Sequence, residues 1–350
     1  MQSNNFHSTS TLSAAGSKKI TPTKSKMAKK ILGIGNAIVD VLCKVDDEFL
    51  RTHGLVKGSM SLIDDAAAKK FSQLKSEKIT SGGSAGNTIA TLAQFGVETR
   101  FIGKVGSDDF GAKFISQIEK TGTEFFGTPS QEKISAKSFI LVTPDAQRTM
   151  CTFLGCASEI TENDISAKAF EAASFLYLEG YLWDAPATIS ALKKSINLAK
   201  ESGAKIAFSL SDAFCVSRHK NDFLNLVAND LDLLFANENE ILELTSASEF
   251  SLKNLENFFA QNKKLTAIVT RSEKGCAVFS EGKYFEVAAE KIEKLTDTTG
   301  AGDAFAAGFL CGLVSECDLQ KSAYFGNILA AKIIQKFGAR FEAEELEGCN

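Results

Sequence analysis

Apolar runs of strand length alternate with helix-like patterns along most of the chain from Lys29 onward. Amphipathic spacing predicts helices over residues 84–95, 110–121 and 186–202, the last two closed by Gly122 and Gly203. Short apolar runs predict buried strands over residues 31–38, 99–105, 175–178, 205–210, 231–236 and 267–270. Such alternation is typical of a parallel sheet with helices on both faces, so the pattern predicts an α/β fold.

Two stretches, at about residues 41–63 and 123–154, break this alternation. They contain short strand-like runs with turns and few helical patterns. Within the second stretch, residues 139–142 and 149–153 flank the turn sequence Thr-Pro-Asp-Ala-Gln, which is typical of a β-hairpin. We expect these stretches to form a small second sheet that projects from the main fold as a lid over the mouth of a site.

The start of the chain differs in composition from the rest. Residues 1–26 hold ten Ser or Thr and four Lys but no Asp or Glu, so they bury too little apolar surface to fold. We expect residues 1–28 to be a disordered extension or the product of a start upstream of Met27, with an organellar targeting peptide as the alternative. Residues 29–345 are expected to form one domain that includes the lid.

Charge and composition exclude several classes of function. The chain has 39 basic and 43 acidic residues and a net charge of −4, which does not favour nucleic-acid binding. It has no run of 18 apolar residues, so no membrane-spanning helix is expected. The eight cysteines form no CxxC pair and the three histidines have no ligand-like spacing, which favours free thiols, a cytoplasmic location and chemistry without histidine.

The strongest chemical motif is the sequence DTTGAGD at residues 297–303, directly before an apolar helix predicted over residues 304–314. Small residues at a helix N-terminus leave backbone N–H groups open to an anion, and the helix dipole favours negative charge there. A carboxylate beside that anion, on Asp303, could take a proton from a hydroxyl group. The anion hole itself would be formed by Gly300, Ala301 and Gly302. The alternative interpretation is an N-capping aspartate after a glycine turn.

A second motif, SGGSAGN at residues 81–87, opens the helix predicted from residue 84. The adjacent Gly82 and Gly83 would let a ligand approach the backbone, because neither carries a side chain. Asn87 could donate to and accept from ligand hydroxyls. The alternative is a flexible loop followed by a helix cap.

Together these two motifs resemble the two signatures of the ribokinase (PfkB) carbohydrate kinase family, and three further segments agree in order. These are a G-x-D-x-x-G-like turn at residues 105–111, an NxxE motif at 237–240, and a TxGxxG-like turn at 270–275 in which Ser272 replaces the first glycine. The resemblance implies a ribokinase-like three-layer α/β/α sandwich with a mostly parallel central sheet and a small β-sheet lid. It also implies an ATP-dependent phosphotransferase that acts on a primary hydroxyl of a ribose-like substrate.

The same resemblance implies roles for individual residues. Asp303 matches the catalytic base, and Glu240 matches a residue that orders Mg²⁺ through water, with K⁺ as a possible second cation near Asp297. The positions that match substrate-binding residues are Asn36, Asp40, Gly82, Gly83, Asn87 and the lid arginine Arg148. Those that match ATP-binding residues are Asn237, Thr270, Gly275 and Asn327.

Substrate choice depends on a finer resemblance. Residues 35–41, 151–157 and 177–183 are similar to bacterial adenosine-kinase-like members, and an aromatic rim near Phe153 would suit a purine base. This implies adenosine and ATP as small-molecule partners, no nucleic acid or membrane partner, and a monomer or homodimer. The alternatives are a fructokinase- or ribokinase-type sugar kinase and a catalytically silent nucleoside-binding protein.

Overall fold

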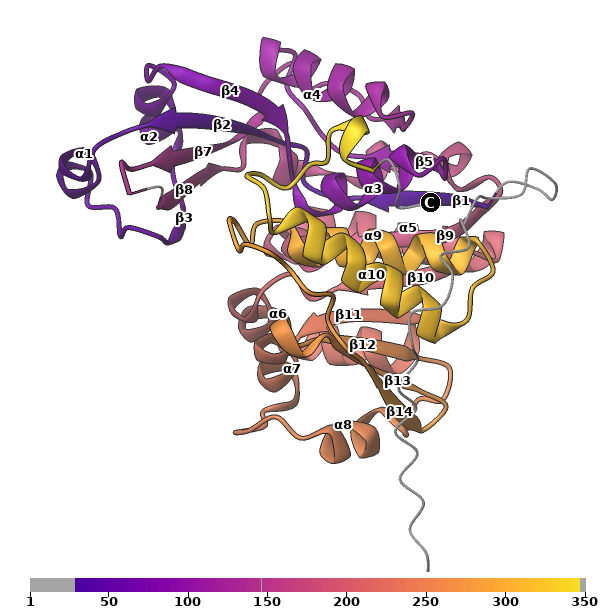
Figure 1. Ribbon diagram of the computed structural model, residues 1–350. Coiled ribbons are helices and arrows are strands. Elements are labelled where there is room, and N and C mark those ends of the chain that lie inside the picture. Colours follow the sequence, from indigo (N-terminus) through magenta and orange to yellow (C-terminus); the bar gives the residue numbers. More distant parts are fainter. Residues whose placement is uncertain (1–28, 146, 347–350) are drawn as a thin grey trace, which may run out of the picture.

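Two β-sheets of different size organise the chain in the computed structural model, which describes residues 29–145 and 147–346. The larger sheet forms the body, and the smaller one projects from it at the upper left of the ribbon (Figure 1). The expected disordered extension, residues 1–28, lies outside the described residues. No helix in the described part of the chain is long and apolar enough to span a membrane.

The large sheet has nine strands in the order β14-β13-β12-β11-β10-β9-β1-β5-β6. Strands from β6 to β12 run parallel, and β13 and β14 are antiparallel additions at one edge. The strands are β1 (Lys30–Ile34), β5 (Glu98–Ile102), β6 (Glu124–Phe126), β9 (Ala173–Glu179), β10 (Lys205–Ser209), β11 (Leu233–Asn237), β12 (Thr266–Thr270), β13 (Cys276–Ser280) and β14 (Lys283–Val287). The expected α/β fold with a mostly parallel sheet is confirmed.

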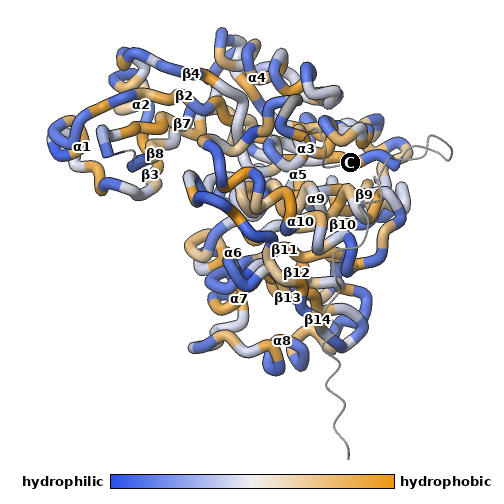
Figure 2. Tube along the Cα trace, viewed as in Figure 1, coloured by the Kyte–Doolittle hydropathy of each residue, from blue (hydrophilic) through white to orange (hydrophobic). Residues whose placement is uncertain are grey.

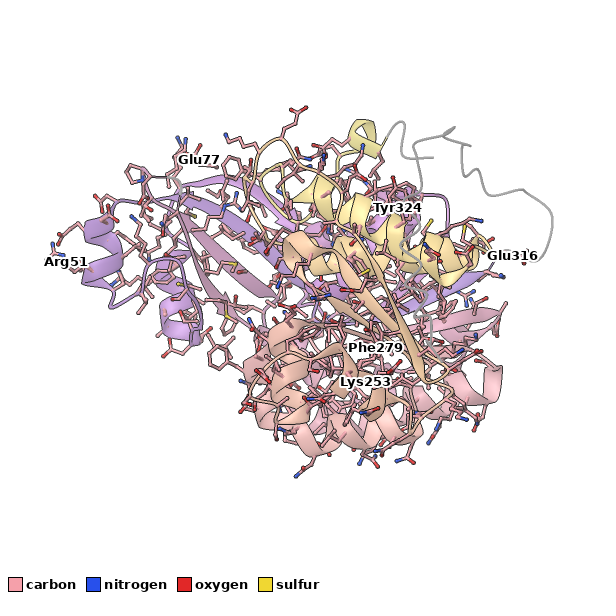
Figure 3. The ribbon with its side chains drawn as sticks, turned by 60° about the horizontal axis from the view of Figure 1, so that its bottom comes forward. Arg51, Glu77, Lys253, Phe279, Glu316 and Tyr324 are labelled. Atoms are coloured by element: carbon pink, nitrogen blue, oxygen red, sulfur yellow. The ribbon has the colours of Figure 1, made fainter. Side chains whose placement is uncertain are left out.

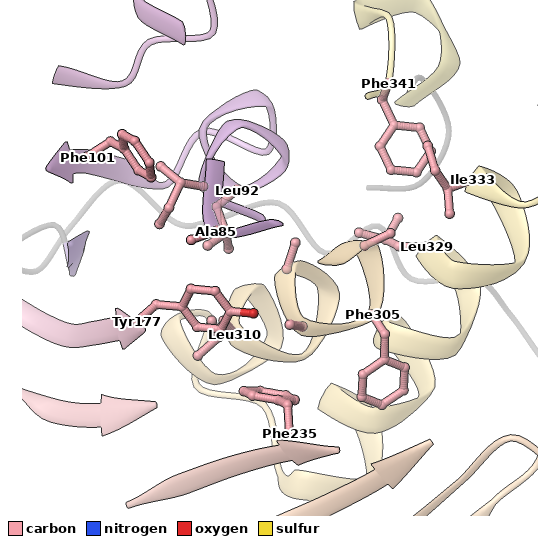
Figure 4. Close-up of a cluster of buried hydrophobic side chains, with 14 of the residues drawn as sticks. Ala85, Leu92, Phe101, Tyr177, Phe235, Phe305, Leu310, Leu329, Ile333 and Phe341 are labelled. Carbon is pink, nitrogen blue, oxygen red and sulfur yellow. The ribbon is translucent and has the colours of Figure 1, made fainter. Parts of the chain in front are cut away.

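Helices cover both faces of this sheet because its central strands are apolar on both sides. In β9, Phe175 and Tyr177 belong to one hydrophobic cluster, and Leu176 and Leu178 belong to the other. The first cluster packs against α3 (Ser84–Gln94), α9 (Ala301–Val314) and α10 (Leu319–Ile333). The second packs against α5 (Pro186–Ser202), α6 (Ala213–Asn229), α7 (Glu238–Thr245) and α8 (Leu252–Phe259). Figure 4 shows part of the first cluster around α9.

Local sequence signals explain where several helices begin and end. Helix α5 starts with Pro186 and is closed by Gly203 in the left-handed conformation, at the predicted bounds. Helix α4 (Asp109–Lys120) is capped by Asp108, whose side chain accepts a hydrogen bond from Gly111 N. The short 3-10 helices are η1 (Gly155–Glu159), η2 (Glu162–Asp164), η3 (Ala167–Phe170), η4 (Gly180–Asp184), η5 (Ser272–Lys274) and η6 (Ala343–Leu346).

The small sheet has five strands in the order β3-β8-β7-β2-β4. These are β2 (Ile38–Lys44), β3 (Met60–Leu62), β4 (Ser76–Ser81), β7 (Ala136–Val142) and β8 (Arg148–Phe153). Strands β7 and β8 form the predicted hairpin, with Val142 opposite Arg148. Helices α1 (Asp47–Thr52) and α2 (Asp65–Phe71) pack on this sheet, where Phe71 contacts Phe139 edge-on. We call this unit the lid sheet.

Three details of the lid differ from expectation. The strand predicted over residues 31–38 ends at Ile34, and Ile38 begins β2 in the other sheet, because the chain turns between them. Strand β4 lies outside the expected lid ranges, whereas β6, inside the range 123–154, belongs to the large sheet. Helices α1 and α2 lie in or beside a stretch that was expected to hold few helices. The sequence signals that indicate where they begin are the N-capping residues Asp46 and Asp64.

The strand order reverses beside β1, and such a reversal predicts a ligand site beyond the carboxyl ends of β1 and β9. Apolar segments follow the central strands and α9, while polar segments follow the outer loops (Figure 2). Charged side chains such as Arg51, Glu77 and Lys253 are exposed on outer elements (Figure 3).

Candidate functional site

The DTTGAGD motif forms the loop and first turn of α9. Gly300 has φ 79° and lies directly before the helix, in a conformation that glycine adopts without strain. Ala301 N donates to Thr298 O at 3.2 Å, so this N–H group is already engaged in a turn. The N–H groups of Gly302 and Asp303 belong to the first helical turn, where no intrahelical carbonyl is available to them. A Cβ at Gly302 would meet no atom within 4 Å, so the space in front of it is open.

The Asp303 carboxylate is held by two side chains from α3. Its Oδ1 accepts a hydrogen bond from Ser84 Oγ at 2.6 Å, and its Oδ2 accepts one from Asn87 Nδ2 at 2.9 Å. Burial raises the pKa of Asp303, while these two hydrogen bonds and the positive charge of Arg340 lower it. The two sequence motifs, more than 200 residues apart, therefore meet at one carboxylate. Sequence reasoning missed Ser84, although it stands inside the second motif.

The other side of the Asn87 amide contacts an arginine that sequence reasoning also missed. Arg340 Nε donates to Asn87 Oδ1 at 2.6 Å, and Arg340 Nη2 lies 3.4 Å from Gly82 O. Burial lowers the pKa of Arg340 to about 10, and the charges of Asp40 and Asp303 oppose this shift. Arg340 is therefore still a cation at neutral pH, and it lies in a site that holds two carboxylates.

Asp40, in strand β2, is the second carboxylate of the site. A Cβ at Gly82 would lie 2.5 Å from Asp40 Oδ2, so only glycine leaves room for this side chain. Within residues 29–145 and 147–346, no group donates a hydrogen bond to the Asp40 carboxylate, which leaves its oxygens open to a ligand. Burial raises the pKa of Asp40 to about 7, with Asp303 adding to the shift and Arg340 and Arg148 opposing it.

Asn36 is held against the first turn of α3 by Glu179, a third acidic residue that sequence reasoning missed. Glu179 Oε1 accepts hydrogen bonds from Asn36 N at 2.8 Å and Asn36 Nδ2 at 3.0 Å, and Glu179 Oε2 accepts one from Ala85 N at 2.7 Å. Gly83 has φ 82°, and a Cβ there would collide with Asn36 O. Burial raises the pKa of Glu179 to about 7. The sequence signal that could have identified Glu179 is its position as an acidic residue at the end of an apolar strand.

Arg148, the expected lid arginine, contacts the loop before α9. Its Nη1 lies 2.6 Å from Asp297 Oδ2, and its guanidinium stands 4.8 Å from the centre of the Phe337 ring. Asp297 also accepts hydrogen bonds from Thr299 N at 3.1 Å, Thr299 Oγ1 at 2.7 Å and Gly338 N at 2.9 Å. Arg148 Nε is buried and has no hydrogen-bond partner in the described part of the chain.

The NxxE motif closes on itself as a helix cap. Asn237 Nδ2 donates to Glu240 Oε1 at 2.6 Å, Asn237 N donates to Glu240 Oε2 at 2.9 Å, and Glu240 N donates to Asn237 Oδ1 at 2.9 Å. Burial raises the pKa of Glu240 to about 7. Among the residues that the structure describes, no three acidic, histidine or cysteine side chains gather in a way that could hold a metal ion.

The remaining predicted ATP-binding residues lie farther along the same sheet edge. Asn237 and Thr270 are register partners at the carboxyl ends of β11 and β12, and Thr270 Oγ1 donates to Ala236 O at 3.3 Å. Gly275 has φ 83°, where a Cβ would collide with Val287 O. Asn327 Nδ2 donates to Ala288 O at 2.9 Å and is buried, so its side chain stabilises the segment after β14.

The structure therefore brings the predicted residues together in two groups. Hydrogen bonds or close contacts connect the predicted substrate-binding residues Asn36, Asp40, Gly82, Gly83 and Asn87 with Asp303, directly or through Glu179 and Arg340. The predicted ATP-binding residues lie at β11, β12 and the elements beyond them. The N-terminus of α9 lies beside the first group, because Asp303 in its first turn accepts hydrogen bonds from Ser84 and Asn87.

Comparison with known proteins gives consistent matches over most of the chain. Residues 55–346 match the model of the pfkB family carbohydrate kinases. The crystal structure of adenosine kinase from Sinorhizobium meliloti is 37% identical, with a TM-score of 0.81 and coverage of 89% of this chain and 96% of that chain. A probable sugar kinase from Rhizobium etli CFN 42 is 35% identical, with a TM-score of 0.81 and coverage of 89% and 95%. Adenosine kinase of Saccharomyces cerevisiae is 28% identical over 341 residues, which cover 91% of this chain and 99% of the yeast protein.

Proposed function

Because the chain belongs to the pfkB family of carbohydrate kinases, we propose that it phosphorylates adenosine with ATP, giving AMP and ADP. The observation that carries this proposal is the Asp303 carboxylate, fixed on both oxygens by Ser84 and Asn87 beside the open N-terminus of α9. The likeness to two adenosine kinases, those of Sinorhizobium meliloti and yeast, supports the choice of acceptor.

Asp303 acts in this proposal as the general base. It removes the proton of the primary hydroxyl while that oxygen attacks the γ-phosphorus of ATP, and ADP leaves from the opposite side. The N–H groups of Gly302 and Asp303 in the first turn of α9 stabilise the charge on the transferring phosphoryl group, as helix N-termini do for anions. Both roles require the ionised carboxylate and an open anion site next to each other.

Asp40 and Asn36 hold the sugar in this proposal. The Asp40 oxygens, which accept no hydrogen bond from the described protein residues, would accept hydrogen bonds from two vicinal hydroxyls of the ribose. Asn36 is positioned by Glu179 and keeps a buried Oδ1 without a partner among the described residues. An unpartnered buried acceptor is costly, so it favours a ligand donor at that position.

Magnesium is proposed to enter with the ATP phosphates. Each Glu240 oxygen accepts one hydrogen bond from Asn237 and keeps a free lone pair, which fits contact with the ion through water better than direct ligation. When bound, Mg²⁺ would neutralise charge on the β- and γ-phosphates. Asp297 fits a direct K⁺ contact poorly, because Thr299, Gly338 and Arg148 already occupy both of its oxygens.

A second candidate function is a sugar kinase that acts on ribose or fructose. It is favoured by the likeness to the Rhizobium etli probable sugar kinase, whose identity is similar to that of the Sinorhizobium meliloti adenosine kinase. Both functions use the same base and anion site, and they differ in what occupies the space beyond the primary hydroxyl.

A substrate panel tests the proposal. ADP formation is measured for the full chain with ATP, Mg²⁺ and adenosine, ribose or fructose, and Asp303→Asn serves as a control for contaminating kinases. We expect the highest kcat/KM with adenosine, and AMP as the product. A higher kcat/KM with ribose or fructose would replace adenosine by the sugar. No acceptor-dependent turnover, together with nucleoside binding, would point to a catalytically silent binding protein.

A further inference from the structure

The segment after α10 crosses the site and touches it with three consecutive residues. Gly338 N donates to Asp297 Oδ2 at 2.9 Å. Ala339 lies against Gly300, where an added Cβ would come within 2.6 Å of the Ala339 Cβ. Arg340 reaches Asn87 and Gly82 on the acceptor side. This short segment, coloured yellow in Figure 1, therefore connects the loop before α9 to the SGGSAGN motif at residues 81–87.

The contact with Arg340 fixes the orientation of the Asn87 amide. A guanidinium carries only donors, so its Nε at 2.6 Å requires the amide oxygen to face it. The amide nitrogen then faces Asp303 Oδ2 at 2.9 Å. In the flipped orientation the amide oxygen would face the carboxylate, and two acceptors would oppose each other. The Asp303 carboxylate and the Arg340 guanidinium therefore favour the same orientation of the amide, and Arg340 holds the amide oxygen that Asp303 does not contact.

We propose that Arg340 is a positioning residue for phosphoryl transfer, which holds Asn87 so that the ionised Asp303 carboxylate is kept aimed at the acceptor hydroxyl. This inference rests on the proposed function. It makes Asn87 part of the support of the base, in addition to the substrate contact that the resemblance implies. Arg340 contacts Asn87 and not Asp303, because no carboxylate oxygen of the described residues lies within 4.0 Å of the Arg340 nitrogens. Arg340 therefore acts on Asp303 through the Asn87 amide and through the positive charge of its guanidinium.

Polar and charged groups from several elements surround Asp303, whose burial raises its pKa. Asp40 from β2 and Glu179 from β9 bring further acidic groups near Asp303, and Tyr177 from β9 is buried near it. Ser84 and Asn87 from α3 donate to the carboxylate. Among the described cations, Arg340 is the one that lowers the pKa of Asp303. Removal of its charge therefore raises that pKa and leaves less ionised base at a given pH.

Three variants test the inference with the full chain. Arg340→Met removes the charge and the donors at similar length, and Arg340→Lys keeps the charge but loses the planar fork. Lys336→Met is the matched control, because Lys336 Nζ donates to Arg340 O at 2.9 Å and supports the same segment without touching Asn87. The readouts are kcat, the KM for ATP, the pH profile of kcat/KM and the unfolding midpoint in urea.

For Arg340→Met we expect kcat to fall at least tenfold, the KM for ATP to change less than twofold, and the acid limb of the kcat/KM profile to move to higher pH. Arg340→Lys is expected to keep the acid limb near that of the wild type and still to lose kcat. Lys336→Met is expected to lower the unfolding midpoint with an unchanged pH profile. If Arg340→Met is too unstable to purify, Arg340→Lys tests the same claim. The expected result is then a lower kcat with an unchanged acid limb of the kcat/KM pH profile.

Coupling to Asn87 separates positioning from packing. If Arg340 acts through Asn87, the Asn87→Ala/Arg340→Met double variant loses less kcat than the product of the two single losses. Fully multiplicative losses, or wild-type kcat and pH profile in Arg340→Met, would overturn the inference. These ratios are measured with whichever acceptor the wild type phosphorylates, so failure of adenosine as substrate contradicts the proposed function and leaves the test of Arg340 intact.

Discussion

Arg148 Nη1 lies 2.6 Å from Asp297 Oδ2, and this ion pair connects strand β8 of the lid sheet to the loop before α9. Both side chains are largely buried, with 14% and 7% of their side-chain surface exposed. The guanidinium also lies over the ring of Phe337. The predicted lid arginine therefore contacts the loop before α9 and, through it, connects the lid sheet to the body of the protein.

Removal of this pair should weaken the docking of the lid. We expect Arg148→Met to lower the free energy of unfolding by about 1–3 kcal/mol, because Asp297 is left buried with one contact fewer. Urea unfolding measures this, and Asp297→Asn in the same background should recover part of the loss. If the stability loss of the double variant equals the sum of the losses in Arg148→Met and Asp297→Asn, the pair contributes no coupling.

The Asp40 carboxylate should recognise the ribose of the substrate through hydrogen bonds to its hydroxyls. We expect Asp40→Ala to weaken adenosine binding at least tenfold while ATP affinity stays nearly unchanged, because charge-assisted hydrogen bonds contribute roughly 1.5–3 kcal/mol each. The wild type should bind 2′-deoxyadenosine more weakly than adenosine, because one of those bonds is lost. Calorimetry with both nucleosides and both proteins measures the difference. The same discrimination in Asp40→Ala as in the wild type would remove Asp40 from sugar recognition.

The raised pKa of Asp40, about 7, has a consequence for stability. A carboxyl whose pKa is higher in the folded than in the unfolded chain favours folding at low pH, and this contribution is lost as pH rises from about 4 to about 7. Asp40→Asn, which gives up no hydrogen bond from the described residues, should therefore be more stable than the wild type at pH 8 by about 1–4 kcal/mol, since one pKa unit corresponds to about 1.4 kcal/mol. At pH 4 the two should unfold alike. An equal difference at both pH values would show that the effect is packing and not titration.

Glu240 should influence the metal requirement. We expect activity to disappear in excess chelator, and Glu240→Gln to need a higher Mg²⁺ concentration for half-maximal rate, because a neutral amide attracts the hydrated ion less strongly. Glu240 also closes the cap of α7, so the variant is compared with Asn237→Ser, which keeps a capping oxygen. Full activity in chelator would contradict the metal proposal. An unchanged Mg²⁺ dependence in Glu240→Gln would show that Glu240 caps α7 and has no role in metal binding.

Local sequence signals predicted much of the fold and the two motifs that meet at Asp303. Helix α5 was predictable to the residue because Pro186 and Gly203 mark its ends. Strand β4 was missed because it is polar and half exposed, so periodicity does not distinguish it from a loop. Glu179 and Arg340 were missed for another reason: each acts on residues that only the fold brings near. Arg340 bonds to Asn87 across 253 positions, and no local pattern marks an arginine that follows a helix as part of a site.

The central claim is that Asp303 is the base of a phosphoryl transfer, and its most direct test is kcat of Asp303→Asn at saturating ATP, Mg²⁺ and acceptor. Asparagine can keep hydrogen bonds to Ser84 and Asn87 but cannot accept the hydroxyl proton, so the variant should fold with a near-normal unfolding midpoint. Its kcat should fall by roughly 10²–10⁴-fold, which is the usual contribution of general-base catalysis. A folded Asp303→Asn protein that retains more than about a tenth of the wild-type kcat would contradict the claim, because loss of the base should cost at least this much.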